Sequence, residues 1–341
     1  MATEALAGEA THVRHGIRSG IPMVVAIHST YLGRSLGGCR MWRYSELEDA
    51  LRDAERLSHA MTLKAAAAGL PLGGGKSVIA LPQGESLEGE RRDAALRDFA
   101  DLLNEIDGRY VTAEDVGVSE ADMAFLSQHT PFVVGRPAEL GGSGDPSPFT
   151  AMGVEIAIRT ALGGSLAGRA ITVAGLGNVG GSLAERLSRA GARLTVTDIN
   201  PARRSLADRL GATWVEPGEA IAVPGDVFAP CALGGVLDEA SVDLLQVPVV
   251  AGAANNQLAH DGVARLLHDR GILWAPDFIA NAGGLINVAA ELDGYDRERV
   301  IRDVEAIAGT LRTVFDRARA EDTTTLDAAH ALVTERLAAR S

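Results

Sequence analysis

Lysine is the residue type whose distribution first suggests chemistry in this chain. Of 32 basic residues, 30 are arginine and only two are lysine, Lys64 and Lys76, twelve positions apart in MTLKAAAAGLPLGGGKS. Arginine supplies positive charge but does not release its proton near neutral pH, whereas a desolvated lysine amine can. A general bias toward arginine would account for the imbalance, but not for two neighbouring lysines. We therefore expect at least one of them to be chemically required.

A second set of residues has the spacing of a dinucleotide-binding turn. Gly175, Gly177 and Gly180 form GxGxxG between an apolar strand pattern and a helical pattern. The first glycine permits the tight bend, the second lets the backbone approach a pyrophosphate, and the third lets the helix pack closely. Asp198 ends the next strand pattern, where a carboxylate accepts hydrogen bonds from ribose hydroxyls and repels a 2′-phosphate. The motif predicts an NAD site, with a structural turn plus a surface aspartate as the alternative.

Other nucleotide and metal chemistry fits less well. GLPLGGGKS resembles a phosphate-binding loop, but Gly69 lies one residue too early, and SVIALP after the lysine looks like a strand where that motif needs a helix. The eight histidines form no HExxH or paired spacing, and the two cysteines, Cys39 and Cys231, are far apart. We expect no metal site and no disulfide. Arg203 and Arg204 follow Asp198 closely, so NADP is not excluded as the cofactor.

Alternating strand and helix patterns must position these residues. In the first part we expect a strand at 22–30, a helix at 46–61, a glycine-rich loop before the strand SVIALP, a helix at 95–106 and a strand at 109–116. The turn cluster GGSGDPSP at 141–148 marks a domain boundary. After it we expect a helix at 151–162, strands at 170–174, 193–197, 226–229, 247–251 and 272–275, and two tail helices separated by EDTTT, whose threonines cap the second. The fold class is α/β with a doubly wound parallel sheet.

Composition narrows the classes of protein. The chain has 341 residues, 46% of them apolar, which is enough for two domains. Its net charge of −13 argues against nucleic acid or an anionic membrane as partner. The start lacks a cationic segment followed by an apolar core, and no apolar run approaches the ~20 residues of a membrane span. These features predict a cytoplasmic protein.

Nine segments together resemble one family. They are LGGCRM, MTLK, GLPLGGGKSVI, TAEDVG, GDPSPFTAMGV, GLGNVG, FAPCALGG, AGAANNQL and NAGGLINVAAEL, in unbroken order over roughly residues 20–295. The chain resembles the amino acid dehydrogenases, which include the leucine, valine, phenylalanine and glutamate enzymes. The resemblance implies an enzyme of the EC 1.4.1 type that deaminates an L-amino acid reversibly to a 2-oxo acid, ammonia and NADH. It also implies a homo-oligomer formed through the N-terminal domain.

The resemblance also implies a domain plan. Residues 1–140 would form an α/β substrate-binding and oligomerisation domain, and residues 141–318 a Rossmann domain that binds NAD. Residues 319–341 would form a C-terminal helix packing back on the first domain. The active site would lie in the cleft between the two domains.

The same resemblance assigns roles to individual residues. Lys76 would be the general base and acid, with Asp115 relaying protons and helping to orient the amino group. Two ammonium groups close together disfavour double protonation and cleft closure removes water, so both effects favour a neutral amine. Substrate would contact Lys64 through its carboxylate, the backbone of Gly37 and Gly38, and Asn255. The cofactor would contact Gly175, Leu176, Gly177, Asn178, Val179, Gly180, Asp198, Ile199, Ala232, Asn256 and Thr150.

Substrate choice depends on four apolar positions. Leu36, Ala113, Leu285 and Val288 match the side-chain pocket of the family, and a charged side chain there would lose its solvation without a partner. Glutamate-type members have a lysine where this chain has Leu36. The pattern looks like the leucine-type enzymes and predicts a branched aliphatic substrate, although GGGKSVIALP and FAPCALGG also resemble phenylalanine-type members. A different NAD-linked oxidoreductase and a catalytically silent NAD-binding protein are the alternatives outside the family.

Overall fold

The computed structural model describes residues 8–339, which form two compact units. Unit 1 comprises residues 8–145, Asn287–Asp296 and 336–339, and unit 2 comprises Pro146–Ile286 and Arg297–Glu335. This division differs from the expected segments in two ways. The short stretch Asn287–Asp296 belongs to unit 1, and most of the C-terminal helix belongs to unit 2.

Hydrogen bonds explain both differences. The carboxylate of Glu291 is fully buried and accepts bonds from the backbone N–H groups of Gly135 and Ser143, each at 2.7 Å. This fixes Asn287–Asp296 in unit 1. At the other end of the tail, the Arg336 guanidinium donates to the carbonyls of Ala66 and Ala67, so only the last turn of the chain joins unit 1.

Unit 1 is built on a mixed sheet of five strands. Their order is β1-β2-β4-β3-β5, with β1 and β4 antiparallel to β2, and β3 parallel to both β4 and β5. The strands are β1 (Ala10–His15), β2 (Pro22–Ser29), β3 (Ser35–Arg43), β4 (Gly73–Leu81) and β5 (Tyr110–Glu114). The sequence analysis did not foresee β1 and β3.

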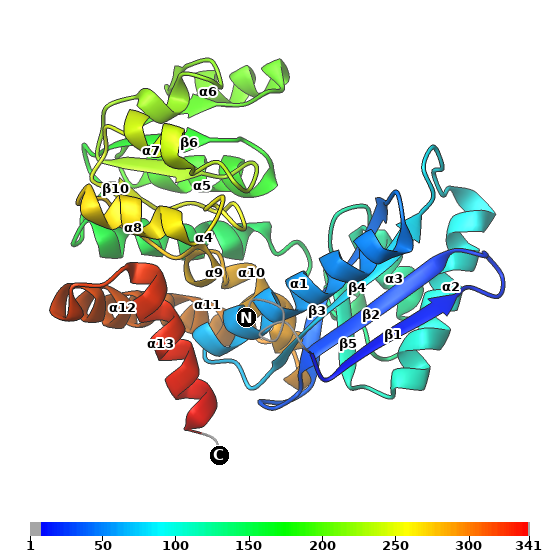
Figure 1. Ribbon diagram of the computed structural model, residues 1–341. Coiled ribbons are helices and arrows are strands. Elements are labelled where there is room, and N and C mark those ends of the chain that lie inside the picture. The colour runs from blue at the N-terminus through cyan, green and yellow to red at the C-terminus, as the bar shows by residue number, and fades with distance from the viewer. Residues whose placement is uncertain (1–7, 340–341) are drawn as a thin grey trace. The chain divides into compact units, whose positions relative to one another are not determined.

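Helices cover both faces of this sheet. The helix α1 (Leu47–Ala67) presents Ala50 and Ala54 to one face, where they pack with alternate residues of β2 and β4 such as Val24 and Val78. The helix α2 (Gly89–Ile106) packs its apolar side, including Phe99, on the opposite face. A short helix, α3 (Glu120–Leu126), follows β5 and begins with a capping box. Figure 1 shows these helices around the sheet of unit 1.

The glycine-rich segment before Lys76 is not the loop that the sequence suggested. Gly73, Gly74 and Gly75 are the first residues of β4, a strand in which every residue is buried. A Cβ on Gly73 would lie 1.8 Å from the Ser29 carbonyl oxygen, and one on Gly74 would lie 2.1 Å from the Thr62 nitrogen. A Cβ on Gly75 would lie 2.5 Å from the Tyr110 ring. The glycines therefore serve close packing of β4 against its neighbours rather than a turn.

Unit 2 is a doubly wound sheet. Six parallel strands lie in the order β11-β10-β9-β6-β7-β8. The strands are β6 (Ala170–Ala174), β7 (Arg193–Thr197), β8 (Thr213–Trp214), β9 (Val227–Pro230), β10 (Val249–Val250) and β11 (Leu273–Trp274). The strand order reverses between β6 and β9, which is where ligands bind in folds of this kind.

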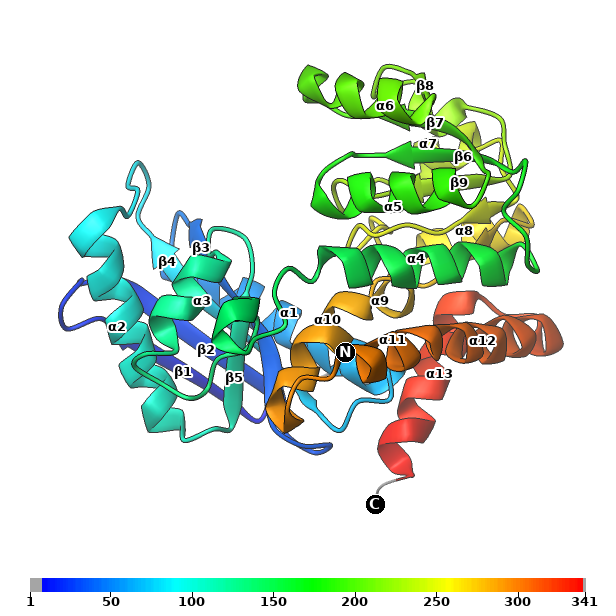
Figure 2. The same cartoon turned by 180° about the vertical axis from the view of Figure 1, so that it is seen from behind.

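Helices lie on both faces of the second sheet. The helices α4 (Ser147–Ala161) and α5 (Asn178–Arg189) lie on one face and α7 (Glu239–Leu244) and α8 (Gly262–Asp269) on the other, as Figures 1 and 2 show from opposite sides. Three short helices are α6 (Arg204–Leu210), α9 (Asp277–Ala280) and α10 (Gly283–Ala289). The tail forms α11 (Arg297–Glu305), α12 (Ile307–Glu321) and α13 (Thr325–Ala338), three helices where two were expected. Thr324 caps α13 by accepting the Asp327 N–H at 3.0 Å.

Within residues 8–339, none of the helices has both the length and the apolar character needed to cross a lipid bilayer.

Candidate active site

Lys76 and Asp115 form an ion pair in unit 1. Lys76 lies on the α1 side of β4 with 6% of its surface exposed, and its Nζ is 2.6 Å from Oδ2 of Asp115, just beyond the end of β5. Burial alone would raise the pKa of Asp115, but the Lys76 ammonium, and after it the Arg40 guanidinium, hold that pKa below its ordinary value. The pair therefore joins a buried amine to a carboxylate that stays ionised.

Gly38 makes room for this pair. It lies on β3 between the two residues, and a Cβ there would be 2.7 Å from Cβ of Asp115 and 3.3 Å from Nζ of Lys76. Gly37 faces the other way, where a Cβ would come within 1.8 Å of the Gly75 carbonyl oxygen. Its own carbonyl accepts a 2.7 Å hydrogen bond from the buried Tyr110 hydroxyl. Both glycines are therefore sites of close approach within the sheet.

Lys64 is carried by the helix that covers this face of the sheet. The sequence pattern ended the helix at residue 61, but α1 continues to Ala67 and places Lys64 in its last turn. A cation there is favoured by the helix dipole.

The expected pocket residues are apolar and buried. Leu36 on β3, Ala113 on β5, and Leu285 and Val288 on α10 are between 1% and 8% exposed. Ala113 pairs with Gly38 across the β3–β5 ladder, so Ala113 and Leu36 lie on the sheet face that bears Lys76. Leu285 belongs to unit 2 and the other three to unit 1.

The glycine turn of unit 2 has the shape of a phosphate cradle. Gly175 has φ of +107°, a backbone conformation that glycine adopts readily. A Cβ on Gly177 would meet nothing within 4 Å, so its backbone is open to a ligand. A Cβ on Gly180 would lie 1.9 Å from the Gly175 carbonyl oxygen. Asn178 and Val179 open α5 after Gly177, and the helix N-terminus with its unpaired N–H groups therefore faces the turn.

Asp198 is held beside this turn. Its Oδ2 accepts the Leu176 N–H at 2.6 Å and its Oδ1 accepts the Asn200 N–H at 2.7 Å. The neighbouring Ile199 is 89% exposed. Ala232 packs against the turn at Gly175, because a Cβ on Gly175 would lie only 2.8 Å from Cβ of Ala232.

The loop with Asn255 and Asn256 is fixed from behind. The Asn281 side chain, 4% exposed, donates from Nδ2 to Oδ1 of Asn255 at 2.8 Å and to the Ala253 carbonyl at 3.1 Å. The buried Gln257 donates to the Gly252 and Ala254 carbonyls. Asn256 has φ of +52°, a backbone conformation that residues other than glycine adopt rarely. Such a conformation persists only where the surrounding structure holds it in place.

Thr150 lies in the first turn of α4, with its hydroxyl bonded to the Pro146 carbonyl at 3.1 Å. Helix α10 approaches it closely, because a Cβ on Gly284 would be 2.5 Å from the Thr150 hydroxyl oxygen.

Comparison with known families identifies this arrangement. Residues 11–132 match the model of the Glu/Leu/Phe/Val dehydrogenase dimerisation domain, and residues 195–340 match the Glutamate/Leucine/Phenylalanine/Valine dehydrogenase model. The chain belongs to the Glu/Leu/Phe/Val dehydrogenase family. It is an NAD(P)-dependent amino acid dehydrogenase, as the sequence resemblance predicted.

Individual relatives differ in their substrates. The chain is 44% identical over 325 residues to a leucine dehydrogenase from Geobacillus stearothermophilus, covering 94% of this chain and 88% of the relative. A phenylalanine dehydrogenase from Lysinibacillus sphaericus is 41% identical, covering 92% and 84%. The crystal structure of L-tryptophan dehydrogenase from Nostoc punctiforme matches with a TM-score of 0.85 at 37% identity, covering 99% of this chain and 98% of that one. Family membership thus fixes the reaction class and leaves the side chain of the substrate open.

Three residues of this dehydrogenase were missed by sequence reasoning although each lies in a quoted motif. Arg40, in LGGCRM, bonds to Asp115; Gln257 and Asn281, in AGAANNQL and NAGGLINVAAEL, anchor the Asn255 loop. Strand alternation would have indicated Arg40, which lies two residues after Gly38 on one face of β3, only if β3 had been predicted.

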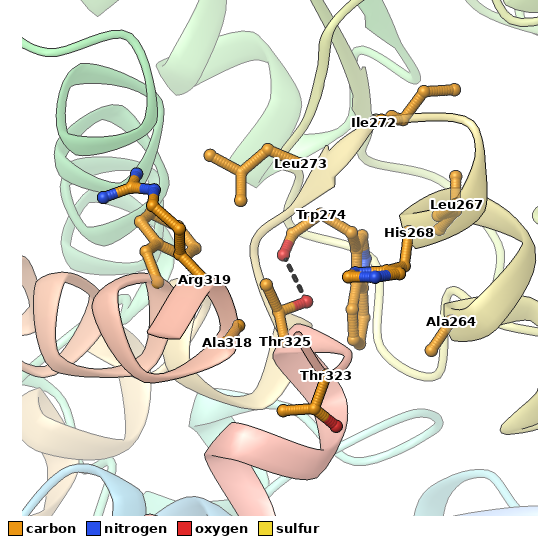
Figure 3. A pocket seen from close by; sticks show the side chains of 12 residues that line it. Ala264, Leu267, His268, Ile272, Leu273, Trp274, Ala318, Arg319, Thr323 and Thr325 are labelled. Carbon is orange, nitrogen blue, oxygen red and sulfur yellow. Dashed lines mark hydrogen bonds between the residues drawn. The ribbon is translucent and has the colours of Figure 1, made fainter. Parts of the chain in front are cut away.

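A further pocket lies away from the expected site residues. This surface pocket of about 220 Å³ is formed by α8, β11, α12 and the start of α13 in unit 2 and includes Leu267, His268, Trp274 and Arg319 (Figure 3). None of the predicted substrate, cofactor or catalytic residues lines it.

Proposed function

We propose that this dehydrogenase oxidises branched aliphatic L-amino acids with NAD⁺ and water to the 2-oxo acid, ammonium, NADH and a proton. The observation that carries the substrate choice is the apolar, buried character of Leu36, Ala113, Leu285 and Val288. A second carboxylate at these positions would lose its hydration without gaining a cation, which is costly. An aliphatic side chain gains from leaving water there.

Lys76 and Asp115 are proposed to handle the protons. Lys76 in its amine form accepts a proton from the water that attacks the substrate Cα after oxidation, and donates it during carbinolamine collapse. Asp115 lies 2.6 Å from Nζ, within reach for a proton to pass between them. Lys64 and the Gly37–Gly38 backbone are proposed to hold the substrate carboxylate, and Asn255 to contact the substrate from unit 2.

The glycine turn fits a dinucleotide because the open Cβ position of Gly177 leaves space for a pyrophosphate. When bound, NAD⁺ supplies the hydride acceptor. Gly175, Leu176, Gly177, Asn178, Val179 and Gly180 would hold the pyrophosphate, while Asp198 and Ile199 would contact the adenosine end. Thr150 would lie near the nicotinamide, and Ala232 and Asn256 would lie near the cofactor. Asp198 favours NAD over NADP, because its carboxylate repels a 2′-phosphate.

Oxidation of NADH in the presence of ammonium and a panel of 2-oxo acids tests the proposal. We expect 4-methyl-2-oxopentanoate and 3-methyl-2-oxobutanoate to give higher kcat/KM than phenylpyruvate or indole-3-pyruvate, and 2-oxoglutarate to be nearly inert. A preference for an aromatic acid would keep the reaction and reverse the specificity. Glutamate activity close to that for leucine would overturn the pocket argument, and no ammonium-dependent activity with any acid would overturn the proposed function.

A matched pair of variants tests the pocket itself. Ala113→Leu extends a side chain from the face shared with Gly38, so it should lower kcat/KM for 4-methyl-2-oxopentanoate more than for the shorter 3-methyl-2-oxobutanoate. Gly218→Ala is the control, because a Cβ there meets nothing within 4 Å. Equal losses for both acids in Ala113→Leu would remove Ala113 from the pocket.

Unit 1 is further proposed to join copies of the chain into a homo-oligomer. The match of residues 11–132 to a dimerisation domain supports this. Light scattering after gel filtration should give a mass at least twice 35.5 kDa, and a monomer at micromolar concentration would contradict it.

A further inference from the structure

The Arg40 guanidinium links Asp115 to a second carboxylate. Its Nε lies 3.2 Å from Oδ2 of Asp115, and its Nη1 lies 2.8 Å from Oδ2 of Asp53 on α1. About a quarter of the Arg40 side chain is exposed, so the two ion pairs are shielded from most of the solvent. The arginine thus reaches from its own strand to the end of β5 on one side and to α1 on the other.

Asp53 holds the far end of this guanidinium in place. Its Oδ2 also accepts the Tyr44 hydroxyl at 2.7 Å, and its Oδ1 pairs with Arg56 at 2.9 Å. Burial alone would raise the pKa of Asp53, but the Tyr44 hydroxyl and the two arginines lower it below its ordinary value. Asp53 therefore remains ionised and keeps Arg40 oriented toward Asp115.

The two oxygens of Asp115 are used unequally. Lys76 and Arg40 both bind Oδ2. Among the hydrogen bonds of residues 8–339, none ends on Oδ1 of Asp115. A carboxylate that is held by two cations on one oxygen has a fixed plane and a second oxygen left to accept from a ligand.

We infer that Arg40 is a positioning residue of this dehydrogenase: it fixes the Asp115 carboxylate through Oδ2 so that Oδ1 accepts from the amino group of the substrate. This inference rests on the proposed function, because the part that Asp115 takes in the reaction beside Lys76 is proposed there. Arg40 itself acts through Asp115 and needs no contact with substrate.

The other titratable groups around Asp115 do not replace Arg40. Glu114, beside it on β5, is an acid whose pKa is raised by burial and by Asp145, Glu120 and Asp115. Burial raises the pKa of Cys39 to about 12 and that of Tyr110 as well, so both are neutral. Without Arg40, Lys76 is the remaining cation bonded to Asp115 within the described chain.

Direct titration of Asp115 tests the electrostatic part. Protein labelled with ¹³C at the aspartate carboxyl carbons is titrated by NMR as parent and Arg40→Gln, and Asp115→Asn identifies the resonance. Removing one of two cations should raise the pH of half-titration of Asp115 by about one unit. Arg56→Gln is the matched control, because Arg56 also pairs with Asp53 but makes no bond to Asp115. An unshifted resonance in Arg40→Gln, or an equal shift in Arg56→Gln, overturns the inference.

Kinetics test the positioning part. In Arg40→Gln the acid limb of the kcat/KM profile for deamination should move to higher pH, because loss of one cation favours the protonated form of the Lys76–Asp115 pair, and Arg40→Lys should restore part of the shift. If Arg40 had only a structural role, Arg40→Gln would lower kcat/KM by the same factor at every pH and leave the position of the limb unchanged. Thermal unfolding of Arg40→Gln would then show a lower stability. An inactive parent refutes the proposed function, whereas an active parent with an unmoved limb in a folded Arg40→Gln refutes only the role of Arg40.

Discussion

Replacement of Lys76 by arginine separates charge from proton transfer in the proposed mechanism. Lys76 is 6% exposed and pairs with Asp115 at 2.6 Å, so an arginine would keep a cation against this carboxylate. It would not release a proton near neutral pH. Loss of a general acid–base group typically costs ~10²–10⁴ in rate, which corresponds to about 2.7–5.5 kcal/mol of activation free energy. We expect kcat of Lys76→Arg to fall within that range.

Crowding must be distinguished from lost chemistry. The guanidinium is larger than an ammonium group, and the Cβ position of Gly38 lies only 3.3 Å from Nζ. Lys76→Met should therefore be measured together with Lys76→Arg, because a methionine side chain has a similar length to lysine and carries no charge. Both variants should fall in kcat by the same order, since neither transfers a proton.

The assay is steady-state deamination of L-leucine, with NADH binding measured by fluorescence titration. NADH affinity should be unchanged, because the glycine turn belongs to unit 2 and Lys76 to unit 1. Lys64→Arg should instead mainly raise KM for the amino acid and change kcat little, since it keeps a cation for the substrate carboxylate. If Lys76→Arg kept kcat within about tenfold of the parent, below the loss expected for an acid–base group, Lys76 would be only a positive charge and the mechanism would be wrong.

Four further predictions concern single residues. Gly38→Ala should lower kcat at least tenfold without losing the fold, because its Cβ would lie 2.7 Å from Cβ of Asp115; full activity would refute the packing argument. Asp198→Ala should raise kcat/KM for NADP⁺ relative to NAD⁺, and an unchanged ratio would remove Asp198 from cofactor choice. Cys39 should resist a thiol reagent at pH 8 in the native protein and react after denaturation, because burial raises its pKa to about 12; rapid native labelling would contradict this. Since the pKa of Asp115 is lowered on folding, its stabilisation is present above the unfolded value of about 4 and is lost as pH falls through the folded value. Asp115→Asn should therefore lower stability at pH 7 and make little difference near pH 2, as checked by urea unfolding.

The sequence predicted the dinucleotide turn well because its determinants are local. Gly175, Gly177 and Gly180 need only the strand before them and the helix after them. The strand formed at the expected residues, 170–174, and a helix follows the turn as expected. The same local logic placed the threonines of EDTTT at the start of the last helix, where Thr324 is the cap.

Other features depend on residues distant in sequence and could not be found by local patterns. Gly73–Gly75 looked like a loop because glycine disfavours strands, yet the surroundings of β4, including Thr62 and Tyr110, leave no room for side chains. Glu291 draws its segment into unit 1 through backbone groups more than 140 residues earlier. Arg40 was overlooked because its partners, Asp53 and Asp115, are contributed by two other elements.

The three glycines that open β4 also have a consequence for folding. Glycine loses more backbone entropy than other residues on ordering, by roughly 0.5–1 kcal/mol each relative to alanine, and these three contribute no side-chain burial in return. The first half of β4 therefore gains its order mainly from β2 and β3 on either side, which pair with it in opposite directions. We expect the amides of Gly74, Gly75 and Lys76 to exchange with deuterium only when the whole sheet opens, together with those of Val25 and Cys39. The Lys76 amine proposed for catalysis would then take its position in the same cooperative step that forms the sheet of unit 1.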